Sequence, residues 1–320
     1  MKLIKRFLIK LYYYYLKLMG LCPFTVAVPE RELKFSLSGL IYNALLVLLY
    51  SYSFLNIFVN RLNIQIFNET ALTVIMDALT LQLQNLAVVT FWILAMVRLK
   101  DARTIFEAVG DCENCRRELA MPSYLDERYL YVTLRFVAIN AVYFAICIVD
   151  YLFLIKNTRY KERSGHWLVF GVCSVDVFVI YVLFIEFMLY VEYYCGRANE
   201  ELLVLSLDPI VDVDDCVVAR VSRRLASINK LQRSLRDAMQ LVTRFIGVPV
   251  TFVMIAHFLS LFTDLYYIYQ VLKSMAFDDY VEAFLVCSFW LSTKFMVTYL
   301  LCSIADSTCV EVNLSMRSRA

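Results

Sequence analysis

Residues 245–271 read FIGVPVTFVMIAHFLSLFTDLYYIYQV, a run that is apolar on every face of a helix. A helix needs about 20 such residues to cross a hydrocarbon layer about 30 Å thick. The preceding residues, 217–244, instead repeat apolar side chains every three or four positions, which predicts an amphipathic helix. The apolar positions are Val221, Leu225, Ile228, Leu231, Leu235, Ala238 and Val242. Because no clear breaker separates the two parts, we expect one helix of roughly 80 Å.

The opposite face of 217–244 is basic. It carries Arg220, Arg223, Arg224, Lys230, Arg233 and Arg236 against a single acid, Asp237. A helix much longer than the bilayer is thick must leave it, so we expect this basic half to extend into water. Apolar residues make up 61% of the 320-residue chain and charged residues only 19%, which indicates an integral membrane protein.

Six segments are long and apolar enough to span a bilayer, and lipid requires them to be helical. They lie at about 37–59, 71–97, 130–155, 167–191, 245–271 and 282–304. The segment before them, 1–36, begins with an aromatic and basic helix that we place at the membrane interface. Lys10 and Lys17 interrupt its apolar residues, which argues against a cleaved signal peptide. The sequence therefore predicts an all-α polytopic bundle with a helical segment, 192–244, and a tail, 305–320, in the cytosol.

The distribution of Lys and Arg orients these spans. With the N-terminus in the cytosol, 22 of the 31 basic residues fall in inner segments and six in outer ones. The outer loop around 156–166 opposes the trend with four of those six. Asn68 begins an Asn-Glu-Thr glycosylation sequon in the first outer loop, which fits this orientation. We expect both termini to be cytosolic.

Motifs for soluble enzymes are missing from the sequence. It has no Gly-x-Gly or Gly-Lys-Ser/Thr loop, and its two His lie on different segments. Cys112 and Cys115 have zinc-like spacing without a second pair, so we interpret them as part of a solvated loop rather than a metal site. No Cys falls in a predicted outer loop, which disfavours a disulfide framework. We expect no enzyme activity, no cofactor, no metal and no nucleic-acid partner.

Ionisable residues inside the spans are costly in lipid and therefore suggest function. With the orientation above, four aspartates lie in the outer halves of spans, and His257 and Lys294 lie near mid-membrane. Together with nearby aromatic residues they predict a ligand pocket that opens to the outside. The predicted ligand residues are Asp77, Tyr143, Asp150, Asp176, Tyr181, His257, Asp264, Tyr267, Trp290 and Lys294. Alternatively, these residues pair with one another, Lys294 with an aspartate for example, and only hold the bundle together.

Three stretches resemble the insect gustatory receptors, a family of multi-pass chemoreceptors. They are YYYYLKLMGLCPF (12–24), SINKLQRSLRDAMQLVTRFIGVPV (227–250) and FWLSTKFMVTYLLCSIADSTCVEVNL (289–314). The resemblance implies a plasma-membrane, ligand-gated cation channel that is tetrameric, alone or with other chemoreceptor subunits. It also implies that a small tastant binds among the outer halves of the helices, with membrane lipid around them.

The chain departs from the family pattern at its end. Members of the family usually have a seventh span, with Thr-Tyr, five apolar residues and Gln-Phe, and that last helix lines the pore. Thr298 and Tyr299 begin a similar pattern here, but Ala305 and Asp306 stand in place of Gln-Phe, and too few spans precede them. We therefore expect that this chain has no pore of its own.

Two other functions remain open. A secondary transporter could use Asp and Lys as coupling groups, although no inverted repeat or broken helix pair supports one. A G-protein-coupled receptor would need an outside N-terminus and seven spans, and the sequence predicts neither. An acid-rich outer half suits a cationic or polyhydroxylated ligand, but the sequence does not identify the compound.

Overall fold

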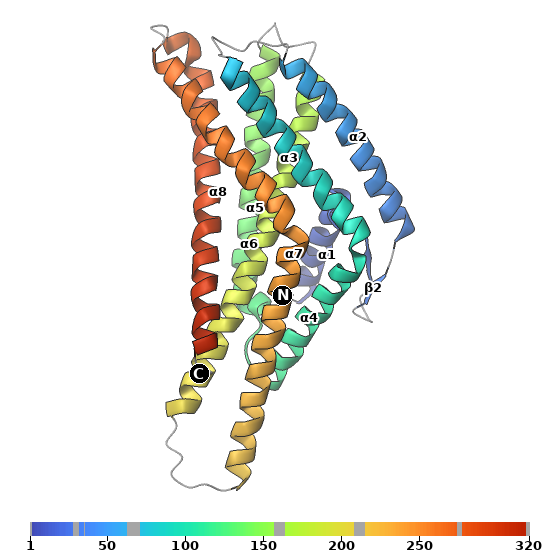
Figure 1. The fold of residues 1–320 in the computed structure, drawn as a ribbon, viewed down its shortest axis with the longest axis vertical. Coiled ribbons are helices and arrows are strands. Elements are labelled where there is room, and N and C mark those ends of the chain that lie inside the picture. Colours follow the sequence, from blue (N-terminus) through green and yellow to red (C-terminus); the bar gives the residue numbers. More distant parts are fainter. Residues whose placement is uncertain are drawn as a thin grey trace. The chain divides into compact units, whose positions relative to one another are not determined.

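The computed structural model describes residues 2–27, 32–34, 36–62, 71–156, 164–207, 215–273 and 277–317. Helices dominate these residues, as predicted (Figure 1). They are α1 (Lys2–Leu18), α2 (Leu37–Leu62), α3 (Ala71–Val97), α4 (Leu99–Glu118), α5 (Tyr124–Lys156), α6 (Ser164–Leu207), α7 (Asp215–Lys273) and α8 (Phe277–Arg317). Two short strands, β1 (Thr25–Ala27) and β2 (Glu32–Lys34), pair antiparallel with Val26 opposite Leu33. The all-α fold class is confirmed, with this small hairpin added.

Six helices in the described part of the chain are long and apolar enough to cross a membrane. The apolar segments are Leu37–Asn56, Ala71–Val97, Tyr131–Val149, Ser174–Ser206, Val218–Gln270 and Cys287–Val312. Each contains most or all of one predicted span. The fifth is part of α7, which runs unbroken through Pro249 and confirms the continuous helix predicted over 217–271.

The described residues divide into two compact units. Unit 1 contains Met1–Leu99, Ala138–Tyr181 and Ile246–Thr298, and unit 2 contains Lys100–Val137, Val182–Phe245 and Tyr299–Ala320. Each of these ranges includes short stretches outside the described residues. Helices α5 to α8 contribute residues to both units.

In unit 2, the amphipathic pattern of α7 produces the core. Ile228, Leu231 and Leu235 are fully buried, whereas Arg223 and Arg233, on the opposite face, are exposed. Residues of α4, α5 and α6 pack against this stripe; the core contains Cys112, Cys115, Leu119, Met121, Tyr124, Val191, Tyr194, Cys195 and Ala198 as well. The predicted division of α7 into an apolar and a basic face is confirmed.

The interpretation of Cys112 and Cys115 as part of a solvated loop is wrong. Both lie on helix α4 and are buried in the unit 2 core. Their three-residue spacing places them on one face of the helix, which is the face that packs against α6 and α7. Burial raises the pKa of the Cys112 thiol to about 12, so this thiol stays protonated and behaves as a small apolar side chain.

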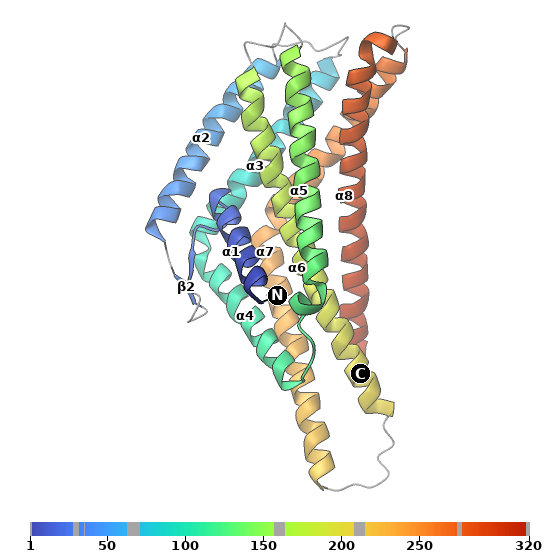
Figure 2. The same cartoon turned by 180° about the vertical axis from the view of Figure 1, so that it is seen from behind.

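In unit 1, Gly20 fixes the path of the chain out of α1 toward the hairpin and α2 (Figure 2). Its φ of 72° is left-handed, and a Cβ at this position would lie 2.9 Å from Nε1 of Trp92. The Asn43 amide donates to the Gly20 carbonyl at 2.7 Å, and the Trp92 indole donates to the Met19 carbonyl at 3.0 Å. The end of α1 is therefore fastened to α2 and α3, which run side by side (Figure 1).

Candidate ligand site

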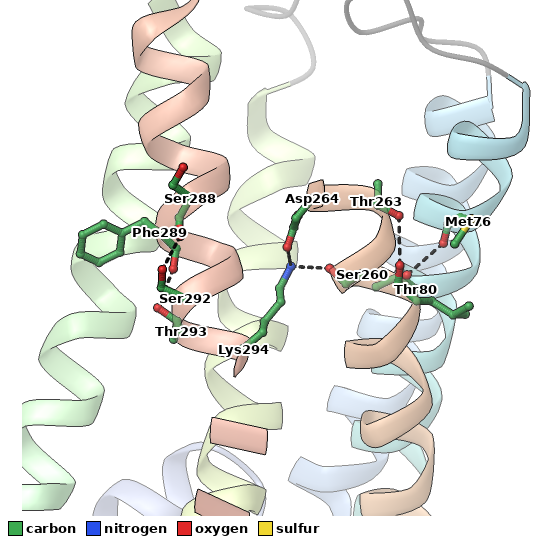
Figure 3. Close-up of polar contacts among 11 residues, drawn as sticks. Met76, Thr80, Ser260, Thr263, Asp264, Ser288, Phe289, Ser292, Thr293 and Lys294 are labelled. Carbon is green, nitrogen blue, oxygen red and sulfur yellow. Dashed lines mark hydrogen bonds and ion pairs between the residues drawn. The ribbon is translucent and has the colours of Figure 1, made fainter. Parts of the chain in front are cut away.

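A buried ion pair joins α7 to α8 within unit 1 (Figure 3). Nζ of Lys294 lies 2.6 Å from Oδ2 of Asp264, and the two side chains are only 8% and 13% exposed. The ammonium group also donates a hydrogen bond to the hydroxyl of Ser260. Ser260 and Asp264 are four residues apart, so they occupy the same face of α7, one turn from each other.

The surroundings of Lys294 account for the presence of a charge at this depth of an apolar helix. A lone ammonium in lipid is expensive, and a carboxylate partner and a hydroxyl acceptor offset part of that cost. The ring of Trp290, one turn earlier on α8, lies 5.3 Å from Nζ and adds a cation–π contact. The sequence left open whether Lys294 pairs with an aspartate, and the structure shows that it pairs with Asp264.

His257 lies on α7 one turn before Ser260 and is 2% exposed. Its ring lies 5.2 Å from that of Tyr181 on α6, and the charge of Lys294 acts on it electrostatically. Neither ring nitrogen has a hydrogen-bond partner among the described residues. A neutral imidazole carries one donor and one acceptor, and leaving both unmade in a protein interior is costly. The site can therefore offer a donor and an acceptor to a bound molecule.

Aromatic side chains from three helices surround this polar group. Tyr143 of α5 stacks on Phe178 of α6 at 4.2 Å and meets the Trp290 ring edge-on at 5.6 Å. Tyr143 and Tyr181 are both buried. Flat rings beside a few polar atoms suit a small ligand that has both apolar and polar parts.

Asp176 has a different partner. It is 1% exposed, and its Oδ2 accepts a hydrogen bond from the hydroxyl of Tyr50 on α2 at 3.4 Å. Burial, together with the charge of Asp176, raises the pKa of Tyr15 on α1, whose hydroxyl donates to Asn140 at 2.8 Å. Asp176 therefore contacts α2 and acts electrostatically on α1, which the sequence did not indicate because these segments are far apart along the chain.

The remaining predicted site residues are placed less centrally. Asp77 is partly buried on α3, and its charge acts on Asp264. Tyr267 is partly buried on α7, with its ring 6.3 Å from that of Tyr266. Asp150 belongs to α5, but its side chain lies outside what the structure describes, as does the predicted glycosylation site at Asn68.

Sequence reasoning missed Ser260 and Tyr50. Ser260 could have been found, because it lies one helical turn from Asp264 on the same predicted helix. Tyr50 carried no signal, since its contact with Asp176 depends on how α2 packs against α6. Within the residues that the structure describes, no group of three or more His, Cys, Asp or Glu side chains could hold a metal ion.

Comparison with known proteins places the chain in a family. A family model described as 7tm chemosensory receptor matches residues 9–313, which is nearly the whole sequence. No curated protein matches it. The six apolar helices fit a multi-pass receptor of this kind, and the resemblance noted from the three sequence stretches is confirmed. The chain belongs to the 7tm chemosensory receptor family.

Proposed function

We propose that this chemoreceptor is a gustatory-type subunit that binds a small polar tastant beside His257 and gates a cation conductance. The observation that carries the proposal is a fully buried imidazole with two unused nitrogens next to a charged pair. A molecule with hydroxyl or amine groups would complete the hydrogen bonding that the protein leaves unmade. The rings of Tyr143 and Trp290 would cover its apolar part.

A ligand bound at this position would change the contact between α7 and α8. A ligand shifts a conformational equilibrium only when it interacts differently with the two states. An amine or hydroxyl that competes for Asp264 or Ser260 would interact differently with the two states, because each of these groups already binds Lys294. Loosening this ion pair would free α8 to move relative to α7 inside unit 1, and we propose this movement as the first step of gating.

The conductance itself belongs to an assembly. We propose a homo- or hetero-tetramer with other chemoreceptor subunits in the plasma membrane, with the N-terminus cytosolic. In this orientation Asp264 lies in the outer half of its span, and His257 and Lys294 lie near mid-membrane. The exposed apolar side chains of α7 and α8, among them Phe262, Phe289 and Phe295, are available for lipid or for a neighbouring subunit.

The test is a functional screen. The full chain is expressed in cells without native taste receptors, alone and together with other receptors of the family. Sugars, amines, amino acids and alkaloids are applied while whole-cell current is recorded. We expect inward cation current for at least one compound, and an N-terminal epitope that antibodies reach only after permeabilisation. Substrate uptake without current, or an epitope accessible on intact cells, would contradict the proposal.

A further inference from the structure

Unit 2 contains a cavity of about 470 Å³ between the beginning of α5, the second half of α6 and the end of α8. Polar and charged side chains make up most of its walls. Its walls include three arginines and four glutamates, and no residue of the proposed tastant site is among them. A cavity with this charge content and volume can hold a small, multiply charged group.

The cavity lies where the helices change from apolar to charged. Tyr131, near the cavity on α5, begins the third apolar segment, and Glu311, in its wall, lies next to Val312, the last residue of the sixth. The apolar segment of α6 continues for 33 residues, more than the about 20 that cross a bilayer, and Glu192 and Arg197 occupy its second half. A bilayer crossed by the apolar segments of α5 and α8 would place its headgroups near this boundary.

Two of the three arginines already have partners. Arg197 lies 3.4 Å from a carboxylate oxygen of Glu127 and 3.1 Å from one of Glu200. Arg135 pairs with Glu186 at 3.3 Å. These ion pairs neutralise most of the positive charge of Arg135 and Arg197, so little of it is left for a ligand.

Arg128 differs from the other two. Its guanidinium lies 6.0 Å from the centre of the Tyr131 ring, and the structure shows no hydrogen bond or ion pair between Arg128 and another described residue. A guanidinium offers five N–H donors in a planar fork that matches the oxygens of a phosphate. Arg128 is therefore the uncommitted anion-binding group of the cavity.

Two glutamates supply the opposite charge. Glu192 accepts its hydrogen bond from the hydroxyl of Ser307 at 2.6 Å, and Glu311 accepts one from the amide of Asn199 at 3.0 Å. Both donors are neutral, and the structure shows no ion pair between either carboxylate and a described cation. Each carboxylate can accept several hydrogen bonds, which suits an ammonium group.

We propose that this cavity binds a zwitterionic group composed of a phosphate and a primary amine, as in the headgroup of phosphatidylethanolamine. The phosphate binds Arg128, and the amine donates to Glu192 and Glu311. Leu134 and Val137 follow Arg128 on α5 and are exposed, so they provide an apolar surface for acyl chains. The same chemistry in a soluble compound, glycerophosphoethanolamine, would fit the cavity without using this surface.

The experiment measures lipid binding to the purified full-length receptor in detergent by native mass spectrometry. The probes are phosphatidylethanolamine, phosphatidylglycerol and glycerophosphoethanolamine. We expect phosphatidylethanolamine to bind best, because phosphatidylglycerol has the phosphate without the amine. Competition by glycerophosphoethanolamine at similar concentrations would identify a soluble ligand, whereas binding of the diacyl lipid alone would identify a membrane lipid. Equal binding of the two lipids, or binding of none of the three probes, would overturn the proposal.

Variants separate the two halves of the site. Arg128→Gln should weaken phosphatidylethanolamine binding at least tenfold, and Arg128→Lys, which keeps the charge, should retain most of it. Glu192→Gln preserves the shape and the contact with Ser307, and should remove the preference for phosphatidylethanolamine over phosphatidylglycerol. Arg103→Gln, on an exposed face of α4, is the matched control and should change nothing. Wild-type binding and selectivity in both Arg128→Gln and Glu192→Gln would refute the site. Misfolding could not explain that result, because a misfolded variant would lose binding.

Discussion

Replacing Lys294 by Met should destabilise the receptor strongly, whereas adding Asp264→Asn to the same chain should restore much of the loss. The single change leaves the carboxylate of Asp264 buried without its cation, since that side chain is only 13% exposed. Removal of one partner from a buried ion pair costs about 3–5 kcal/mol. The double variant has no charge left to desolvate, and neutral replacement of a buried pair is often close to neutral in stability.

The assay is a double-mutant cycle on the free energy of unfolding, measured by steric trapping in lipid bicelles. The four proteins are wild type, Lys294→Met, Asp264→Asn and the double variant. We expect the double variant to be more stable than Lys294→Met by about 2 kcal/mol or more, which would demonstrate direct coupling. Lys100→Met, at an exposed position of α4, is the control and should stay within about 0.5 kcal/mol of wild type.

Additive effects would refute this reasoning. If the double variant loses the sum of the two single losses, Lys294 and Asp264 do not interact in the membrane, and the ion pair cannot link α7 to α8. Losses below about 0.5 kcal/mol for both single variants would likewise mean that water reaches the pair and screens it.

Three further results are expected from the rest of the molecule. Gly20→Ala should lower the free energy of unfolding by about 1–3 kcal/mol, because it combines a left-handed φ with a clash at the Trp92 indole. The control, Gly110→Ala inside α4, has open space at its Cβ and should be neutral or stabilising. Equal melting temperatures for the two variants would contradict the predicted strain at Gly20. Iodoacetamide should alkylate Cys112 about a thousandfold more slowly in the folded receptor than in the unfolded chain at pH 8, because the rise in pKa from 9.0 to about 12 lowers the thiolate fraction by that factor. Similar alkylation rates for the folded and unfolded protein, measured by mass spectrometry, would show that the unit 2 core is open. Ile228→Ala should lower the free energy of unfolding by about 2–5 kcal/mol, because it leaves a cavity in unit 2. Val218→Ala, at an exposed position of α7, should lower it by less than about 0.5 kcal/mol. The midpoint of chemical unfolding distinguishes the two variants.

Helix α7 shows how much of the fold could be predicted from the sequence. Its periodicity identified both the buried stripe around Leu231 and the exposed basic face, because the same 3.6-residue repeat determines helix geometry and burial. Six apolar segments long enough to span were predicted for the same reason, since bilayer thickness sets a minimum length. These features depend on local sequence alone.

Contacts between distant segments could not be predicted in the same way. Cys112 and Cys115 were assigned to a solvated loop because their zinc-like spacing has no second pair, but they lie on the face of α4 that packs against α6 and α7. The sequence predicted four aspartates as equal candidates. Only packing distinguishes Asp264, which pairs with Lys294, from Asp176, which accepts a hydrogen bond from Tyr50. Periodicity indicates which face is buried, but it does not identify the partner across the interface.

The central claim, that the polar group around His257 recognises a ligand, is tested most directly by one equilibrium binding measurement. The most potent compound from the functional screen is bound to purified wild-type receptor, to His257→Ala and to Phe258→Ala. Phe258 follows His257 on α7, but its side chain is exposed, so it controls for local helix effects. Loss of about 1.4 kcal/mol from the hydrogen bonds of the imidazole predicts a Kd about tenfold higher for His257→Ala and no change for Phe258→Ala. The same Kd for all three proteins would contradict the claim.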